Sequence, residues 1–258
     1  MQIVLPSDYF EKTKPDEAFQ SQATAFAQAG FAVHTFDFEN LTTSRRFVPK
    51  LAPEATLLRG WMLSLDNYQT FLAALQAAGG TPLISADQYR AAHHLPQWYP
   101  LLKDFTPETV IVTDLDQAET TLQALPWERF FIKDFVKSLK TSMGSMIDSP
   151  SKIAGLIAEM SKFRGTIEGG LCIRRVEDIL PETEQRFFVW KQVPFALDSK
   201  VQIPEEVKFA ARVIPSPFFS VDLVRTKAGQ NRIIEIGDGQ VSDIVGWTPE
   251  RLAEVLAK

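Results

Sequence analysis

The chain has 258 residues and a net charge of −5, because 27 lysines and arginines stand against 32 aspartates and glutamates. Hydrophobic residues make up 45% and charged residues 23%, which excludes disordered, collagen-like and coiled-coil proteins. The single cysteine, Cys172, excludes an intrachain disulfide and favours a reducing compartment. No apolar run reaches the roughly 18 residues of a spanning helix, and the amino terminus lacks a secretion-signal layout. We therefore expect a soluble, cytoplasmic protein with no membrane partner.

The first hundred residues alternate between apolar strands and amphipathic helices. Strands are expected at 2–5, 31–36 and 55–58. Helices are expected from about residue 15 to Gly30 and around 68–75, before a pair of glycines. Strand followed by helix, repeated, predicts a parallel sheet with helices packed on its faces.

A stretch rich in proline and aromatic residues, 95–107, follows neither the helical nor the strand period. We interpret it as a connection between two lobes. Beyond it the pattern is mainly strands, with helical stripes at 153–160, around 207–214 and after Thr248. The expected strands are 110–112, 129–136, 171–176, 186–190, 218–224 and 232–236. The fold class is therefore α/β (α+β), with a first lobe at 1–105 and a second domain at 106–258.

Residues 218–240 (FFSVDLVRTKAGQNRIIEIGDGQ) read as two strands joined by a turn at 227–230. A turn centred between Ala228 and Gly229 places Asp222 directly opposite Glu235. Opposed like charges destabilise a sheet, and a divalent cation held by carboxylates would compensate them. Asp238 follows between two glycines and would add a third ligand. The alternative is a register shifted by one, with these acids on a solvated face; the apolar flanks of Asp222 favour the metal interpretation.

Basic residues form a second group around a polar loop at 138–145 (SLKTSMGS). Such a loop can close over phosphates with its N–H groups and an ammonium, and arginines on strands can clamp phosphoryl oxygens. Each of these residues alone is typical of a solvated surface, but beside a carboxylate metal site they predict metal–nucleotide binding. The group comprises Lys133, Lys137, Lys140, Arg174, Arg175 and Arg186.

Other catalytic motifs are absent from the sequence, including a Walker loop, HExxH, GxSxG and paired CxxC. The three histidines are too few for a zinc site: we expect His34 to be partly buried, and His93 and His94 to lie on the surface. Cys172 lies in an apolar strand and is expected to be a core residue rather than a nucleophile.

The order of elements is a lysine strand, a glycine-containing loop, an arginine strand, then Asp followed by Glu-x-x-Asp. It resembles the ATP-grasp superfamily, and in detail a divergent branch of predicted ligases named for two arginines and a lysine. The similarity covers nearly the whole chain, including RGWML at 59–63 and DLVRTKAGQNRIIEIGDGQVSDI at the carboxy end. It implies an amino-terminal small α/β pre-grasp lobe at 1–105, followed by an ATP-grasp domain of two α+β subdomains at 106–258.

The resemblance also implies residue roles. ATP would lie between the two subdomains, with its adenine at the backbone just after strand 171–175, and Arg59 would face the acceptor side or be an exposed charge at a strand end. The usual third metal ligand of the superfamily is asparagine, so Asp238 leaves the number of Mg²⁺ ions at one or two. The implied catalytic residues are Lys133, Arg174 and Arg186; the cofactor-binding residues are Lys133, Lys137, Arg175 and Glu235; and the metal ligands are Asp222, Glu235 and Asp238.

We therefore expect an ATP-dependent ligase that forms an amide through an acylphosphate, with an unidentified carboxylate, amine or peptide as acceptor and a homodimer as the default assembly. One alternative is a nucleic-acid end-joining ligase, with RNA as partner and Trp98, Tyr99 and Trp247 as stacking platforms; the acidic net charge counts against it. The other alternative is a non-catalytic ATP sensor.

Overall fold

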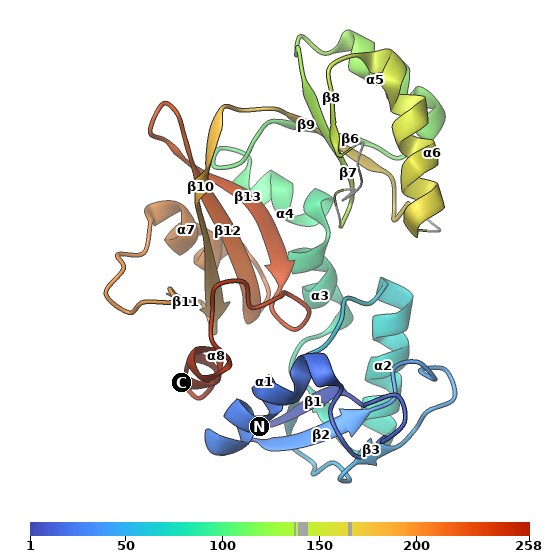
Figure 1. Cartoon of the computed structure of the whole chain (residues 1–258), viewed down its shortest axis with the longest axis vertical. Helices are drawn as coiled ribbons and strands as arrows, with labels where there is room; N and C mark the ends of the chain where they lie inside the picture. The colour runs from blue at the N-terminus through green and yellow to red at the C-terminus, as the bar shows by residue number, and fades with distance from the viewer. Residues whose placement is uncertain (137, 139–143, 165–166) are drawn as a thin grey trace. The chain divides into compact units, whose positions relative to one another are not determined.

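The computed structural model describes residues 1–136, 138, 144–164 and 167–258, and Figure 1 shows its elements. The chain divides into two compact units. Unit 1 consists of residues 1–92, 186–221 and 237–258, and unit 2 of residues 93–185 and 222–236. Because the units interleave along the chain, they do not test the predicted domain boundary after residue 105, which stays a prediction. Within the described residues, no helix is long and apolar enough to cross a membrane.

A mostly parallel sheet is the framework of the amino-terminal part of unit 1. Its strand order is β3-β2-β1-β4-β5. Strands β2, β1, β4 and β5 run parallel, as the sequence predicts, and only the two-residue β3 is antiparallel. The strands are β1 (Gln2–Pro6), β2 (Ala32–Phe36), β3 (Phe47–Val48), β4 (Ala55–Leu58) and β5 (Thr81–Pro82).

Both ends of the chain supply the core of unit 1. Phe26, Phe36 and Phe71 share one apolar cluster with Phe218 and Leu252 from the carboxy-terminal half. Helices α1 and α8 contact each other, as Figure 1 also shows. The helices are η1 (Glu17–Phe19), α1 (Gln20–Gln28), α2 (Leu65–Ala77), α3 (Ala86–His93, whose last residue belongs to unit 2), α7 (Glu205–Val213) and α8 (Pro249–Leu256).

Unit 2 contains an antiparallel sheet of order β6-β9-β7-β8. Alternation along β7 and β9 turns Phe130, Ile132 and Ile173 into an apolar core with Leu156 and Met160 of α6. Figure 1 shows α5 and α6 together on one side of this sheet. The elements are β6 (Thr109–Val112), η2 (Leu115–Gln117), α5 (Ala118–Ala124), β7 (Phe130–Asp134), β8 (Met146–Ile147), η3 (Pro150–Lys152), α6 (Ile153–Arg164) and β9 (Leu171–Arg175).

Residues 95–107 are not the irregular connection that the sequence predicts, because they begin with helix α4 (Leu95–Leu102). One of its prolines lies in the first turn, where its missing N–H has no partner to lose. Leu95, Trp98 and Leu102 are buried at positions i, i+3 and i+7, which form one helical face. The two prolines therefore concealed a short apolar stripe.

The third sheet has the order β11-β10-β12-β13. It consists of β10 (Ile179–Trp190), β11 (Val193–Phe195), β12 (Phe218–Thr226) and β13 (Asn231–Asp238). The predicted turn between the last two strands is confirmed. Mixed α/β composition with several sheets confirms the predicted fold class.

The turn differs in type from the predicted one. The Gly229 N–H donates to the Thr226 carbonyl (2.9 Å), and the Thr226 N–H donates to the Gln230 carbonyl (2.8 Å). With φ at +83° for Gly229, this is a three-residue loop with a glycine bulge, which shifts the pairing near the tip by one residue. At the far end the Gly239 N–H donates to the Phe218 carbonyl (3.0 Å), in the predicted register. Direct opposition of Asp222 and Glu235 stays a prediction.

We predict that Gly169→Ala destabilises unit 2 by at least about 2 kcal/mol. Its φ is +76°, and an added Cβ would lie 2.2 Å from the Phe135 ring. The matched control is Gly155→Ala, at an exposed position of α6 where a Cβ meets nothing within 4 Å; it should stabilise by about 0.5–1 kcal/mol. Urea denaturation of both variants measures the difference, and equal midpoints would contradict the packing described here.

Candidate functional site

A cavity of about 520 Å³ opens entirely among residues of unit 2. Its volume lies in the range of small-molecule sites, and an apolar lining with a few charged groups is typical of them. Strands β7, β9 and β13 and the β9–β10 linker, defined as residues 176–178, contribute to its wall. The lining residues are Pro107, Arg129, Phe131, Lys133, Ser138, Met146, Arg174, Arg175, Val176, Glu177, Asp178, Ile179, Pro181, Lys227, Ile234 and Glu235.

Lys133 projects from β7 into this cavity. It pairs with Cys172 in the β7–β9 register, as Phe131 pairs with Arg174, so these four side chains share the sheet face opposite the α5–α6 core. The Lys133 side chain is 6% exposed, and its Nζ donates to Glu235 Oε1 at 3.4 Å. Burying an ammonium is costly unless it is paired, so Glu235 balances Lys133 across the cavity wall.

Arg174 is also buried, and its guanidinium is used by the protein itself. Its two terminal nitrogens donate to the Ile234 carbonyl and to Thr106 Oγ1, both at 2.6 Å. The guanidinium carbon lies 6.0 Å from the centre of the Trp98 ring. Burial lowers the pKa of Arg174 to about 10, so the group stays charged at neutral pH. Arg174 therefore ties β9 to β13, and its predicted catalytic role stays a prediction.

Glu235 is the carboxylate of this cavity. Its side chain is 45% exposed, in contrast to that of Lys133, so it faces the cavity while forming the ion pair. Arg175 lies at the end of β9 and lines the same cavity with an exposed side chain. Lys133, Arg174, Arg175 and Glu235 are thus brought together as the sequence predicts.

The remaining predicted metal ligands are buried carboxylates. Asp222 belongs to unit 2 and is 3% exposed, whereas Asp238 belongs to unit 1 and has no exposed surface. Oδ1 of Asp238 accepts from the backbone and side-chain nitrogens of Gln240 (3.0 and 3.1 Å), while Oδ2 has no hydrogen-bond partner among the described residues. In the described part of the chain, no three Asp, Glu, His or Cys side chains form a cluster suited to a metal ion.

Arg186 belongs to unit 1 and is not among the residues that line the cavity. Its guanidinium donates to the Asp243 carbonyl at 2.6 Å. Its predicted contact with a transferring phosphoryl group stays a prediction. Lys137 and Lys140 lie outside the described residues, and so does most of the predicted phosphate loop.

Arg59 is not the exposed strand-end charge that one interpretation of the sequence suggests, because it is 1% exposed. Its Nε and one terminal nitrogen donate to Gln22 Oε1 (3.1 and 3.0 Å), and the other donates to the carbonyls of Gly239 and Ser242. Burial lowers its pKa to about 10. Arg59 therefore holds the loop that directly follows Asp238, a role that a single exposed-or-functional choice could not anticipate.

Two further expectations from sequence are wrong. His93 is buried and His94 is largely buried, with its Nε2 3.2 Å from Glu168 Oε1, so neither is a surface residue. Trp98 and Trp247 are buried, so they are not platforms on which bases could stack. The core assignment of Cys172 is confirmed: it is fully buried, and burial raises its pKa to about 12.

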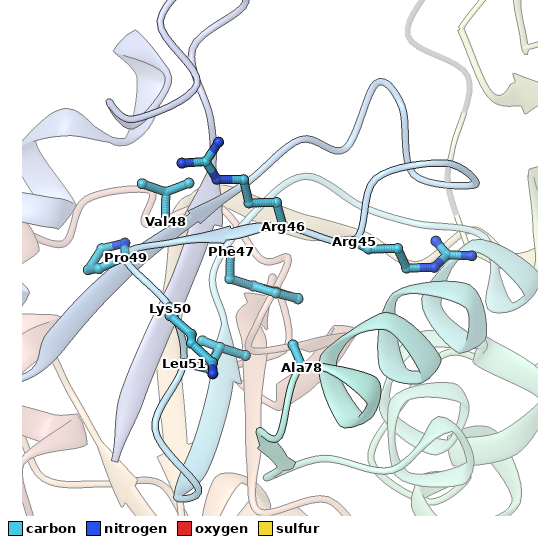
Figure 2. A pocket seen from close by; sticks show the side chains of 8 residues that line it. All are labelled: Arg45, Arg46, Phe47, Val48, Pro49, Lys50, Leu51 and Ala78. Atoms are coloured by element: carbon cyan, nitrogen blue, oxygen red, sulfur yellow. The ribbon is translucent and has the colours of Figure 1, made fainter.

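A second cavity, of about 420 Å³, lies in unit 1 beside β3 (Figure 2). Its floor is apolar, with Phe47 and Leu51, and its charged residues are Arg45, Arg46 and Lys50. Figure 2 shows the Arg45 and Arg46 side chains extending in opposite directions. Phosphate recognition requires donors that converge, so the cavity of unit 2 is the stronger candidate.

Sequence reasoning missed two parts of the unit 2 site. Lys227, at the hairpin turn, lines the cavity, and its N–H donates to the Asp178 carbonyl at 2.7 Å. Arg232, outside the lining, forms a double contact with Glu177 of the β9–β10 linker. The spacing of Arg232 on β13 was visible, but nothing local connects it to a partner 55 residues away.

Comparison with protein families gives a match over residues 122–256, just over half of the chain, to the model of an ATP-grasp domain, family 3 of its clade. The chain therefore belongs to this ATP-grasp family. Membership confirms the predicted superfamily and the enzyme class, an ATP-dependent ligase. Comparison with curated proteins gives no match.

Solved ATP-grasp structures share the fold over the whole chain. D-cycloserine synthetase DcsG is 14% identical, with a TM-score of 0.63 and coverage of 100% of this chain and 99% of that one. A RimK domain ATP-grasp protein from Sphaerobacter thermophilus is 14% identical (TM-score 0.65; 100% and 98% covered). A RiPP-associated ATP-grasp ligase from Chryseobacterium gregarium, in complex with ADP and a leader and core peptide, is 9% identical (TM-score 0.60; 100% and 96% covered).

We predict that protein stability falls with rising pH through Asp238. Burial raises the pKa of this carboxyl from 3.8 to about 7, so the folded chain keeps a proton that the unfolded chain has lost. This contribution is complete below about pH 4 and is lost as pH rises to 7, a change of up to about 4 kcal/mol in the free energy of unfolding.

Asp238→Asn serves as the comparison, because the amide keeps the oxygen that accepts from Gln240 and cannot ionise. Denaturation from pH 4 to 7, without divalent cations, should show the wild-type curve falling relative to that of the variant. Parallel curves would show that Asp238 does not ionise in the way described.

Proposed function

We propose that this ATP-grasp chain uses Mg²⁺-ATP to join a carboxylate to an amine, with an amino acid or a peptide as acceptor. The observation that carries the proposal is the cavity of unit 2, in which a buried lysine and a carboxylate meet at an apolar wall. A nucleoside triphosphate needs both kinds of surface, one for its base and one for its phosphates.

The two ends of the cavity suggest how ATP is oriented. Val176, Ile179 and Pro181 lie at or after the β9–β10 linker and offer apolar surface and backbone groups for the adenine. Lys133 and Glu235 supply the charged part of the wall. We assign the phosphates to Lys133, which contributes an ammonium without needing a proton transfer, and assign a supporting contact to Arg175.

The residues present fit a magnesium ion in their chemistry. Carboxylate oxygens are the ligands that this hard cation prefers, and the buried Asp238 Oδ2 has no hydrogen-bond partner among the described residues. Glu235, Asp222 and Asp238 would hold Mg²⁺ in one or two sites, where the metal neutralises phosphate charge. With the ion bound, Glu235 divides its two oxygens between the metal and Lys133.

The proposed chemistry needs no side-chain nucleophile. An oxygen of the substrate carboxylate attacks the γ-phosphorus, the bond to the β-phosphate oxygen breaks, and ADP leaves with that electron pair. The amine of the acceptor then attacks the acylphosphate carbon, phosphate leaves, and the amine loses a proton. Lys133 stabilises the charge that accumulates on the transferring oxygens, and we extend the same role to Arg186.

The acceptor class rests on the comparisons. The similar structures include a D-cycloserine synthetase and a ligase, PsnB, complexed with a minimal precursor, Mg and ADP. Another is the macrocyclase MdnC bound with its precursor peptide MdnA. These titles describe those proteins, and they support an amino acid or peptide here. No observation favours RNA, since two of the three proposed stacking residues are buried.

We predict that Lys133→Met weakens Mg²⁺-ATP binding at least about tenfold, because it removes a buried ammonium from the phosphate end of the cavity. Titration calorimetry with Mg²⁺-ATP measures the change. Lys162→Met, at an exposed lysine of α6 in the same unit, is the matched control and should bind like the wild type. Equal affinity of the wild type and Lys133→Met would remove Lys133 from the site.

The products of ATP identify the reaction. With α-labelled ATP, Mg²⁺ and pools of amino acids or peptides, we expect ADP that appears only with an acceptor. AMP, or an adenylated protein or 5′-phosphorylated RNA, would indicate end-joining chemistry and contradict the acylphosphate route. ATP binding without turnover in any pool would favour the sensor.

A further inference from the structure

Arg232 forms the most extensively bonded ion pair among the described residues of unit 2. From β13, its Nε and one terminal nitrogen donate to the two carboxylate oxygens of Glu177, at 2.8 and 2.6 Å. The two side chains are 18% and 21% exposed. A two-point pairing of this kind fixes orientation as well as distance, and its partial burial distinguishes it from the exposed pairs of the surface.

The same guanidinium also reaches the segment before β6. Its terminal nitrogens donate to the carbonyls of Asp104 (3.0 Å) and Thr106 (2.8 Å). The Thr106 hydroxyl donates to the Ile233 carbonyl (2.7 Å), and the Ile233 N–H donates to the Phe105 carbonyl (2.8 Å). Arg232 therefore joins β13, residues 104–106 and the β9–β10 linker through one planar group.

What Arg232 holds is part of the cavity wall, although Arg232 itself does not line the cavity. Val176, Glu177 and Asp178 all line it. Beyond the Glu177 side chain, the linker is held by the Lys227 N–H, which donates to the Asp178 carbonyl, and by a longer bond (3.4 Å) from the Val176 N–H to the Arg129 carbonyl. The Arg232–Glu177 pair is the charged contact among these restraints.

We propose that Arg232 is a positioning residue that holds the β9–β10 linker in the conformation that receives the nucleotide base, and so sets affinity for the base without touching it. The proposal rests on the proposed function, because it takes this cavity as the ATP site. The phosphate end is held separately: Lys133 and Glu235 pair with each other, and neither contacts Arg232 in the bonds described. Loss of Arg232 should therefore affect the base and spare the phosphates.

A purely structural role would give a different result. If Arg232 only stabilised unit 2, its loss would weaken every ligand of the cavity alike. A ligand that has the phosphates but no base separates the two cases. Inorganic tripolyphosphate with Mg²⁺ carries the charge of the triphosphate and offers nothing to the linker.

The test is titration calorimetry of Mg²⁺-ATP and Mg²⁺-tripolyphosphate with the full chain and four variants. Arg232→Met should weaken Mg²⁺-ATP binding about tenfold and change tripolyphosphate binding by less than about twofold. Arg232→Lys keeps the charge but loses the planar fork, so it should fall between. The double variant Arg232→Met/Glu177→Met should be no weaker than Arg232→Met alone, because both changes break one interaction. Arg90→Met, at an exposed arginine paired with Asp87, is the control and should match the wild type.

Equal weakening of both ligands by Arg232→Lys, which keeps the charge and so favours folding, would overturn the positioning role. Unchanged Mg²⁺-ATP affinity in Arg232→Met would overturn it as well. A wild type that binds neither ligand would overturn the proposed function itself, and this result is separate because it appears before any variant is compared.

Discussion

Two buried cations on one face of a small sheet determine the architecture around the site. Lys133 and Arg174 lie on the face of β7 and β9 that points away from the α5–α6 core, and both are almost completely removed from solvent. Burying such charges costs several kcal/mol each unless partners are supplied. Strand β13 supplies them through the Glu235 carboxylate and the Ile234 carbonyl. The position of β13 in unit 2 thus follows from the need to compensate these charges.

The cavity is the space that this arrangement leaves open. Arg174 is occupied by Ile234 and Thr106, so it works as a tie between strands, whereas Lys133 pairs with a carboxylate that is itself half exposed. Glu235 can therefore turn towards a metal ion while Lys133 turns towards phosphate. Arg232 makes a comparable tie at the other end of the cavity through Glu177. Charged side chains that look alike in sequence thus divide into those that build the wall and those that can meet the ligand.

Much of the fold follows from local pattern, and the site only in part. Alternating apolar residues gave the strands, and the spacing of Phe131 and Lys133 on β7 correctly predicted a shared face on the cavity. The sequence also grouped Lys133, Arg174, Arg175 and Glu235, but it could not tell a guanidinium bonded to backbone from one open to a ligand. Helix α4 was missed because prolines in its first turn and interior resemble a connection. The burial of Arg59, His93 and Trp98 depends on partners far along the chain, such as Gly239 for Arg59, and no local pattern encodes such partners.

The most direct test of this account is hydrogen–deuterium exchange of the full chain with and without a non-hydrolysable Mg²⁺-ATP analogue. Amide exchange reports which backbone segments become protected when a ligand binds. The account predicts slower exchange in unit 2, at β7, at the β9–β10 linker and around Ile234 and Glu235. Protection confined to residues 45–51, beside the cavity of unit 1 in Figure 2, would place the nucleotide elsewhere and contradict the account.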